Sequence, residues 1–212
     1  MLPILYSFRR CPYAMRARMS LILTSSQCEL REVILKNKPD AMIGISPKGT
    51  VPILNLHGEI LEESLEIIQW AIKKNSSKLH SFSEIESSIS SHLINLFDTQ
   101  FKYHLDRYKY SDRYENLSED HQQECLRILF ELDKCIDAKP WIFGKTVSLL
   151  DICILPFIRQ CKIANPNWFE SQGFSKVIDL LLHFESSELF LLSMEKFDVW
   201  DPDDPQVNIF PK

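Results

Sequence analysis

The stretch that decides the fold is residues 8–19, which read FRRCPYAMRARM. Residues 2–8 form a short β-rich run that leads into it. Apolar residues then recur at helical spacing: Met15, Met19, Ile22 and Leu23. Pro12 suits a first helical position, because its fixed φ is helical and its missing N–H would have no intrahelical partner. Cys11 is therefore predicted to be the N-cap residue at a strand-to-helix junction.

A thiol at this position has a specific chemistry. It faces the unpaired backbone N–H groups and the positive end of the helix dipole, and both favour the thiolate. Arg9, Arg10 and Arg16 add positive charge nearby. The sequence therefore predicts that Cys11 is reactive.

Composition bounds the class of protein. A chain of 212 residues with a net charge of −5 is long enough to bury a core without disulfides. Its longest apolar runs, such as residues 152–158, fall well short of the roughly 20 residues of a membrane helix. The apolar residues of the N-terminus precede the arginines, the reverse of a secretory signal. We expect no membrane association and a cytoplasmic protein.

The six cysteines are scattered, with no paired spacing of the kind that encloses zinc, so no metal is expected. No dense Lys/Arg cluster interleaved with aromatic residues occurs either, so nucleic acid is not an expected partner. The charge is uneven: residues 1–80 carry more Lys and Arg than Asp and Glu, and the remainder carries the opposite excess. This asymmetry suggests two units.

The order of predicted elements defines two domains. Residues 1–75 predict β-α-β-α-β-β-α, an α/β unit in which the first crossover implies two parallel strands. Residues 76–82 are polar and without periodicity, and are taken as a linker. Helical patterns dominate residues 83–200, including a capping-box spacing at Ser148-x-x-Asp151. Residues 201–212, with three prolines, predict an extended tail.

Three separated motifs carry a family resemblance: Cys11-Pro12-Tyr13-Ala14, Thr50-Val51-Pro52 and Glu63-Ser64. In this order of elements they resemble the glutathione transferase superfamily, which has a thioredoxin-like first domain and an all-helical second one. The cysteine-type, omega-like members are the most similar, because they also carry a segment like residues 35–39 (LKNKP). The resemblance implies glutathione as cosubstrate.

The resemblance also assigns roles to single residues. Val51 is expected to pair through its backbone with the cysteinyl part of glutathione, beside a cis bond to Pro52. Ser64 is expected to hold the γ-glutamyl carboxylate at a helix start. Glu63 would accept from the ligand's ammonium, and Lys38 would reach its glycyl carboxylate. The resemblance further implies that Tyr13 helps to line the site.

The implied reaction is thiol transfer through a mixed disulfide at Cys11. Ala14 stands where dithiol relatives have a second cysteine, so a second glutathione would have to resolve the intermediate. The expected partners are glutathione and a small electrophilic or disulfide substrate, and the family suggests a homodimer. Two alternatives stay open: a conjugating transferase that uses Ser7 or Tyr6, and a noncatalytic relative that binds a partner.

The helical domain is expected to supply the wall for the second substrate. The candidates are Phe101, Tyr103, His104, Arg107 and Tyr108. Their spacing fits an ordinary helix equally well.

Overall fold

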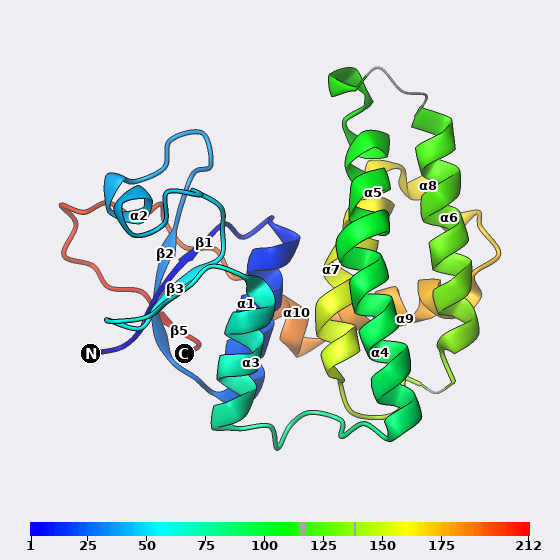
Figure 1. The fold of residues 1–212 in the computed structure, drawn as a ribbon, viewed down its shortest axis with the longest axis horizontal. Helices are drawn as coiled ribbons and strands as arrows, with labels where there is room; N and C mark the ends of the chain where they lie inside the picture. The colour runs from blue at the N-terminus through cyan, green and yellow to red at the C-terminus, as the bar shows by residue number, and fades with distance from the viewer. Residues whose placement is uncertain (115–117, 138) are drawn as a thin grey trace. The chain divides into compact units, whose positions relative to one another are not determined.

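The structure is a computed structural model that describes residues 1–114, 118–137 and 139–212. The chain forms two compact units. The first comprises residues 1–78 together with 187–212, and the second comprises residues 79–186. Figure 1 colours the chain by residue number, so the late segment of the first unit stands out in orange and red.

The first unit has the predicted β-α-β-α-β-β-α order, followed by elements from the end of the chain. In sequence these elements are β1 (Ile4–Ser7), α1 (Pro12–Thr24), β2 (Cys28–Glu32), α2 (Asp40–Ile45), β3 (Ile53–Asn55), β4 (Ile60–Leu61), α3 (Ser64–Lys74), α10 (Glu188–Ser193) and β5 (Ile209–Phe210). The sheet order is β4-β3-β1-β2-β5. Strands β1 and β2 are parallel, and the other pairs are antiparallel. This arrangement confirms the thioredoxin-like fold.

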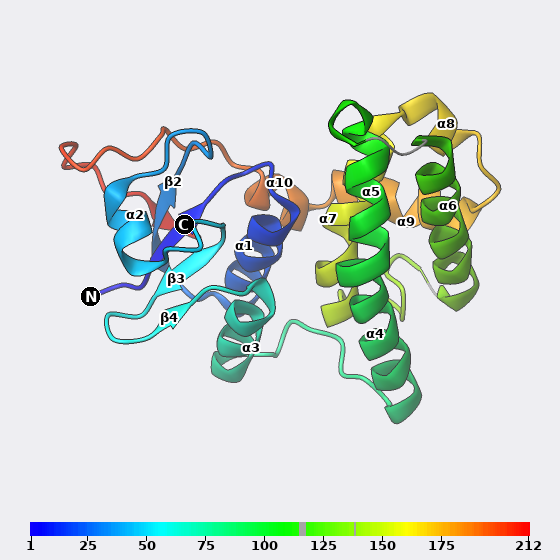
Figure 2. The ribbon, with the colours of Figure 1, turned by 45° about the horizontal axis from the view of Figure 1, so that its top comes forward.

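Two apolar clusters hold the sheet. Residues of α1 and α3, including Ala17, Leu21 and Ile67, pack with Leu5, Leu30 and Phe210 in one cluster of buried side chains. The second cluster joins Tyr6, Val33 and Ile53 to Met42 of α2. Figure 2 shows α1 and α3 beside each other on one side of the sheet, with α2 on the other.

The second unit is helical. Its elements are α4 (Glu84–Leu96), a π-helical turn (Phe97–Phe101), α5 (Lys102–Lys109), a 3₁₀ turn (Ser111–Arg113), α6 (Ser118–Cys135), α7 (Leu149–Ala164), α8 (Pro166–Glu170) and α9 (Ser175–Ser186). The side chains of residues 150–158 are all buried, so α7 forms the core of this unit. Pro156 lies inside this helix. The predicted capping box is confirmed, because Ser148 is the N-cap residue of α7 and Asp151 is its N3 residue.

The structure differs from the expected boundaries near the end of the chain. Residues 187–200, expected in the helical domain, cluster with the first unit, and residues 209–210 of the tail form the strand β5. The reason is hydrogen bonding: β5 pairs with the edge of β2, and Trp200 N–H donates to the carbonyl of Glu32 at 2.8 Å. The single long helix expected around residues 85–97 continues instead through a π turn into α5.

Ser148→Ala should lower the free energy of unfolding by about 2 kcal/mol, because the buried hydroxyl both donates to Asp151 at 2.6 Å and accepts from its N–H at 3.2 Å. Chemical denaturation measures this loss. Ser83→Ala is the matched control: Ser83 caps α4 in the same motif but is exposed. An equal loss in the two variants would contradict the role of burial.

Asp151 makes stability depend on pH. Burial raises the pKa of its carboxyl to about 6, although bonds from Ser148 and Ile142 act in the opposite direction. In the unfolded chain this pKa is about 4, so the folded state holds the proton more tightly, and stability falls as pH rises from 4 to 6. We expect Asp151→Asn to remove up to about 3 kcal/mol of this pH dependence. Denaturation curves of both proteins at pH 4 and pH 7 test it, and parallel pH profiles would contradict it.

Candidate active site

Cys11 is the N-cap residue of α1 and Pro12 is its first helical residue, as predicted. The backbone of Cys11 is extended, with φ −77° and ψ 124°. Its N–H donates to the carbonyl of Phe8 at 2.9 Å, which closes the turn between β1 and α1. The side chain is partly exposed. The geometry thus presents the sulfur at the helix N-terminus.

The thiol meets the backbone of Val51. Cys11 Sγ lies 3.7 Å from the Val51 carbonyl oxygen, a distance at which an S–H donates. The bond from Val51 to Pro52 is cis, as the resemblance implies, and both side chains are buried. Two segments that are 40 residues apart in sequence therefore meet at the sulfur.

Gly49 shapes the turn before Val51. Its φ is +62°, and a Cβ there would lie 3.1 Å from Ile43 Cδ1 and 3.4 Å from Lys38 Nζ. Both facts favour glycine. The same distances place the exposed Lys38 side chain beside this turn, and the resemblance implies that Lys38 reaches the glycyl carboxylate of glutathione.

Ser64 is the first residue of α3, and only 4% of its surface is exposed. Its Oγ accepts from Arg16 Nη1 of α1 at 3.3 Å. The Arg16 guanidinium, which is fully buried, also lies 5.3 Å from the centre of the Tyr13 ring. An anion at Ser64 would meet a hydroxyl, the N-terminus of α3 and the charge of Arg16. The structure thus brings Tyr13 and Ser64 together through a residue that links them.

Glu63 is exposed and is the N-cap residue of α3. Its carboxylate pairs with Lys48, and this hydrogen bond raises the pKa of the lysine. A ligand ammonium at Glu63 would therefore have to share or displace Lys48. The pair is solvent-screened, so the exchange would cost little.

The alternative hydroxyls are buried. Ser7 has no exposed surface, and its Oγ accepts from Arg18 Nε at 2.9 Å. Tyr6 is 2% exposed, and its hydroxyl accepts from Arg31 Nη1 at 2.8 Å. Neither side chain is placed to reach a ligand.

Sequence reasoning missed the partners of these residues. From the sequence Arg16 is expected only to add charge, and no local pattern marks Lys48, Arg18 or Glu32 as part of the site. The sequence holds a signal for the last two: Arg18 is at helical spacing with the apolar residues Met15 and Ile22, and Glu32 is in phase with the buried residues of β2. Two opposite charges on facing buried surfaces predict an ion pair.

Of the candidates of the helical unit, Tyr103 contacts both His104, at a ring separation of 5.0 Å, and Arg107, at 3.4 Å from the ring centre. Phe101 is fully buried and stacks on Phe97 at a ring separation of 4.5 Å. His104 Nδ1 lies 2.8 Å from His121 Nδ1, and burial, followed by the charge of His121, lowers the pKa of His104. Tyr103 is exposed and lies against Arg107.

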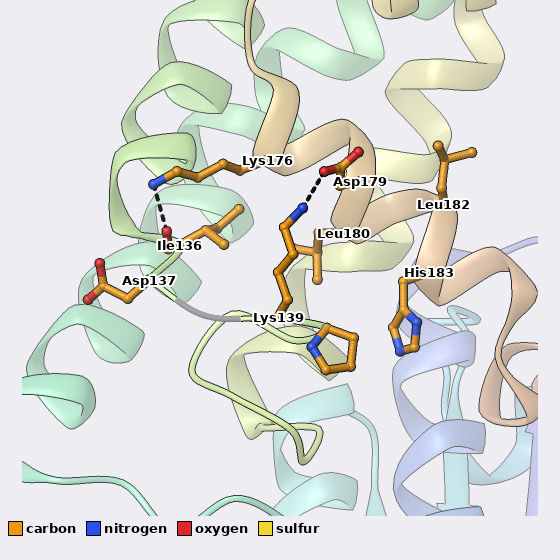
Figure 3. A pocket seen from close by; sticks show the side chains of 9 residues that line it. Ile136, Asp137, Lys139, Lys176, Asp179, Leu180, Leu182 and His183 are labelled. Atoms are coloured by element: carbon orange, nitrogen blue, oxygen red, sulfur yellow. Dashed lines mark hydrogen bonds and ion pairs between the residues drawn. The ribbon is translucent and has the colours of Figure 1, made fainter.

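A cavity of about 460 Å³ lies in the helical unit, between residues 136–137 and 139–140 on one side and α9 on the other (Figure 3). Its two lysines have partners: Lys139 pairs with Asp179 at 2.6 Å, and Lys176 donates to the Ile136 carbonyl at 2.8 Å. None of the site residues expected from the sequence lines this cavity.

Within the part of the chain that the structure describes, no three His, Cys, Asp or Glu side chains gather as metal ligands would. None of the helices described combines the length and apolarity that crossing a membrane requires.

Comparison with known proteins places the fold. Residues 5–78 match the family model for the glutathione S-transferase N-terminal domain. Two solved structures resemble the chain over 92% of its length: glutathione transferase Omega 3C from Trametes versicolor (TM-score 0.77, 21% identity, 84% of that chain) and a glutathione transferase family member from Pseudomonas fluorescens pf-5 with two glutathione bound (TM-score 0.78, 19% identity, 92% of that chain).

Two curated relatives that resemble the chain are also named glutathione S-transferases. The protein named probable glutathione S-transferase DHAR2, chloroplastic, from Oryza sativa subsp. japonica is 25% identical over 191 residues, covering 88% of this chain but only 64% of that protein. Glutathione S-transferase omega-1 from Mus musculus is 24% identical over 208 residues, covering 90% of this chain and 75% of that protein.

The fold and the comparisons show a protein with a thioredoxin-like unit and an all-helical unit. Residues 5–78 belong to the family of glutathione S-transferase N-terminal domains, and the chain as a whole is similar to omega-class glutathione transferases.

Proposed function

We propose that the chain is a glutathione-dependent thiol transferase or reductase in which Cys11 is the nucleophile. The observation that carries the proposal is the position of Cys11 at the N-terminus of α1, with its sulfur 3.7 Å from the Val51 carbonyl oxygen. The omega and DHAR names of the relatives support this class of activity.

Glutathione would lie across the first unit. Its γ-glutamyl carboxylate would bind at Ser64, where the hydroxyl, the N-terminus of α3 and Arg16 favour an anion. Its ammonium would approach Glu63, and its glycyl carboxylate would approach Lys38. The backbone of Val51 would pair with the cysteinyl residue in between, as an added strand does. The relative from Pseudomonas fluorescens, whose structure holds two glutathione molecules, supports the choice of ligand.

Glutathione binding would also favour ionisation of the Cys11 thiol. The Val51 carbonyl oxygen accepts from the Cys11 thiol, an interaction that only the protonated thiol can make. An N–H of the ligand at the same oxygen would replace this bond. The sulfur would then lose a partner that favours its protonated form, while the N-terminus of α1 continues to favour the thiolate.

The reaction proceeds in two exchanges. The Cys11 thiolate attacks the glutathione sulfur of a mixed disulfide, so that the substrate disulfide breaks, a Cys11–glutathione disulfide forms and the substrate leaves as a thiol after taking up a proton. A second glutathione thiolate then attacks that disulfide, releasing oxidised glutathione and the Cys11 thiolate. Ala14 leaves no cysteine at the position of a local resolving thiol, so a free glutathione thiol completes the cycle. In sum, one mixed disulfide and one glutathione give the substrate thiol and oxidised glutathione.

Burial disfavours the conjugating alternative. The Ser7 and Tyr6 hydroxyls accept from Arg18 and Arg31 and are almost without exposed surface. Activation of a glutathione thiol by either would require the surrounding core to open.

Cys11→Ser should lower the rate of glutathione-dependent disulfide reduction by at least about 10³-fold, because the serine hydroxyl is not ionised near neutral pH. A coupled assay of oxidised glutathione formation measures it. Cys135→Ser is the control, since Cys135 is the other partly exposed cysteine. Reduction at wild-type rate by Cys11→Ser would exclude Cys11 as the nucleophile, and survival of conjugation alone would favour the alternative.

Ser64→Ala should weaken glutathione binding by about 10-fold, roughly 1.4 kcal/mol, because the carboxylate loses one charge-assisted hydrogen bond. Calorimetric titration of the Cys11→Ser protein, which cannot form the mixed disulfide, measures the Kd. Ser83→Ala in the same background is the control, since Ser83 begins a helix of the other unit. An unchanged Kd for Ser64→Ala would place the carboxylate elsewhere.

A further inference from the structure

Glu32 is the last residue of β2, and it is 8% exposed. Its two carboxylate oxygens have different partners. Oε1 accepts from the backbone N–H of Arg9 at 2.8 Å, and Oε2 accepts from Arg18 Nη2. One carboxylate thus connects a loop to a helix.

The loop is the one that carries the thiol. Residues 8–11 lead from β1 to α1, and Cys11 N–H closes their turn on the Phe8 carbonyl at 2.9 Å. Arg9 lies between these two residues, so its bond to Glu32 fixes the middle of the turn. Strands β1 and β2 lie side by side and pair in parallel (Figure 1), with Ser7 opposite Glu32. Glu32 therefore lies beside the start of this loop.

Arg18 holds the carboxylate in place. Its guanidinium has no exposed surface, and it also donates to Ser7 Oγ at 2.9 Å and to the carbonyls of Ser193 and Glu195 at 3.2 Å each. With these partners the guanidinium cannot rotate without breaking several buried hydrogen bonds. Arg18 therefore fixes the orientation of the Glu32 carboxylate.

We propose that Glu32, held by Arg18, is a positioning residue that fixes the Phe8–Cys11 turn and thereby keeps the Cys11 sulfur at the N-terminus of α1. The inference rests on the proposed function only in taking Cys11 as the nucleophile. Glu32 acts through the backbone of Arg9 and touches no reacting atom.

The anchoring role of Glu32 and its negative charge predict opposite changes in the pKa of the Cys11 thiol, so the two can be told apart by experiment. A carboxylate near a thiol disfavours the thiolate, so removal of its charge alone would lower the pKa of the Cys11 thiol. Loss of the turn's anchor would instead move the sulfur away from the helix N-terminus and raise this pKa. The other charges around the cavity beside Glu32 are Arg9, Arg10, Lys196 and Asp198. The variants below leave all four in place.

The experiment uses two variants of the full chain. Glu32→Asp keeps the charge but shortens the side chain, and Glu32→Ala removes both. Iodoacetamide alkylation of the Cys11 peptide, followed by mass spectrometry across pH 4–9, gives the thiol pKa without any assay of activity. We expect it to rise by about one pH unit in both variants, so that alkylation at a pH below that pKa slows by about 10-fold. Hydrogen exchange at the Arg9 amide should lose its protection in parallel.

Glu29 supplies the matched control. It lies on the same strand, and its Oε1 accepts from Arg31 Nε at 2.6 Å, within β2 and away from the loop. Glu29→Asp and Glu29→Ala should leave the Cys11 pKa unchanged.

An unchanged thiol pKa in Glu32→Asp, or a lower one in Glu32→Ala, would overturn the proposal. If Glu32→Ala does not fold, Glu32→Asp decides alone. Failure of the proposed function is a separate result, because it would appear as full reductase activity in Cys11→Ser whatever the Glu32 variants do to the thiol.

Discussion

Arg18 is a cation buried in the first unit, and the groups around it offset the free-energy cost of burying its charge. An isolated charge in an apolar interior costs far more than a folded domain can supply, so the guanidinium requires an anion and several acceptors. Glu32 is the anion, and Ser7 and the carbonyls of Ser193 and Glu195 are the acceptors. Burial lowers the pKa of Arg18, and Glu32 opposes that effect. Removal of Glu32 alone would leave a buried charge without its counterion.

This constraint joins three parts of the first unit. The end of β2, the middle of α1 and the end of α10 with the residues just after it all meet at one ion pair. The turn that presents Cys11 is attached to this ion pair through the Arg9 amide. The apolar clusters explain why α1 packs on the sheet, but hydrophobic burial is not directional. Hydrogen bonds to a fixed carboxylate are directional, and they define where the sulfur lies within that packing.

The sequence predicts those features that depend on neighbouring residues. The N-cap position of Cys11 follows from Pro12 and the run around it, and the start of α7 follows from the spacing of Ser148 and Asp151. The order of elements in the first unit follows from periodicity and turns. The π turn at residues 97–101 does not, because its apolar spacing continues that of the helix before it.

Local sequence patterns do not predict contacts between segments that are distant along the chain. The bond from Arg16 to Ser64 joins residues 48 apart, and the bonds from Arg18 to the carbonyls of Ser193 and Glu195 join residues more than 170 apart. Strand β5 has two residues, too few for any alternation to be visible. A β2 edge without a partner would expose unpaired backbone groups, and residues 209–210 satisfy them. The unit that bears the thiol is therefore discontinuous in sequence, with the whole helical unit inserted between its parts. The β2–β5 pairing and the hydrogen bonds from Arg18 to Ser193 and Glu195 can form only after residues 187–212 are available. These contacts are therefore among the most non-local in the chain.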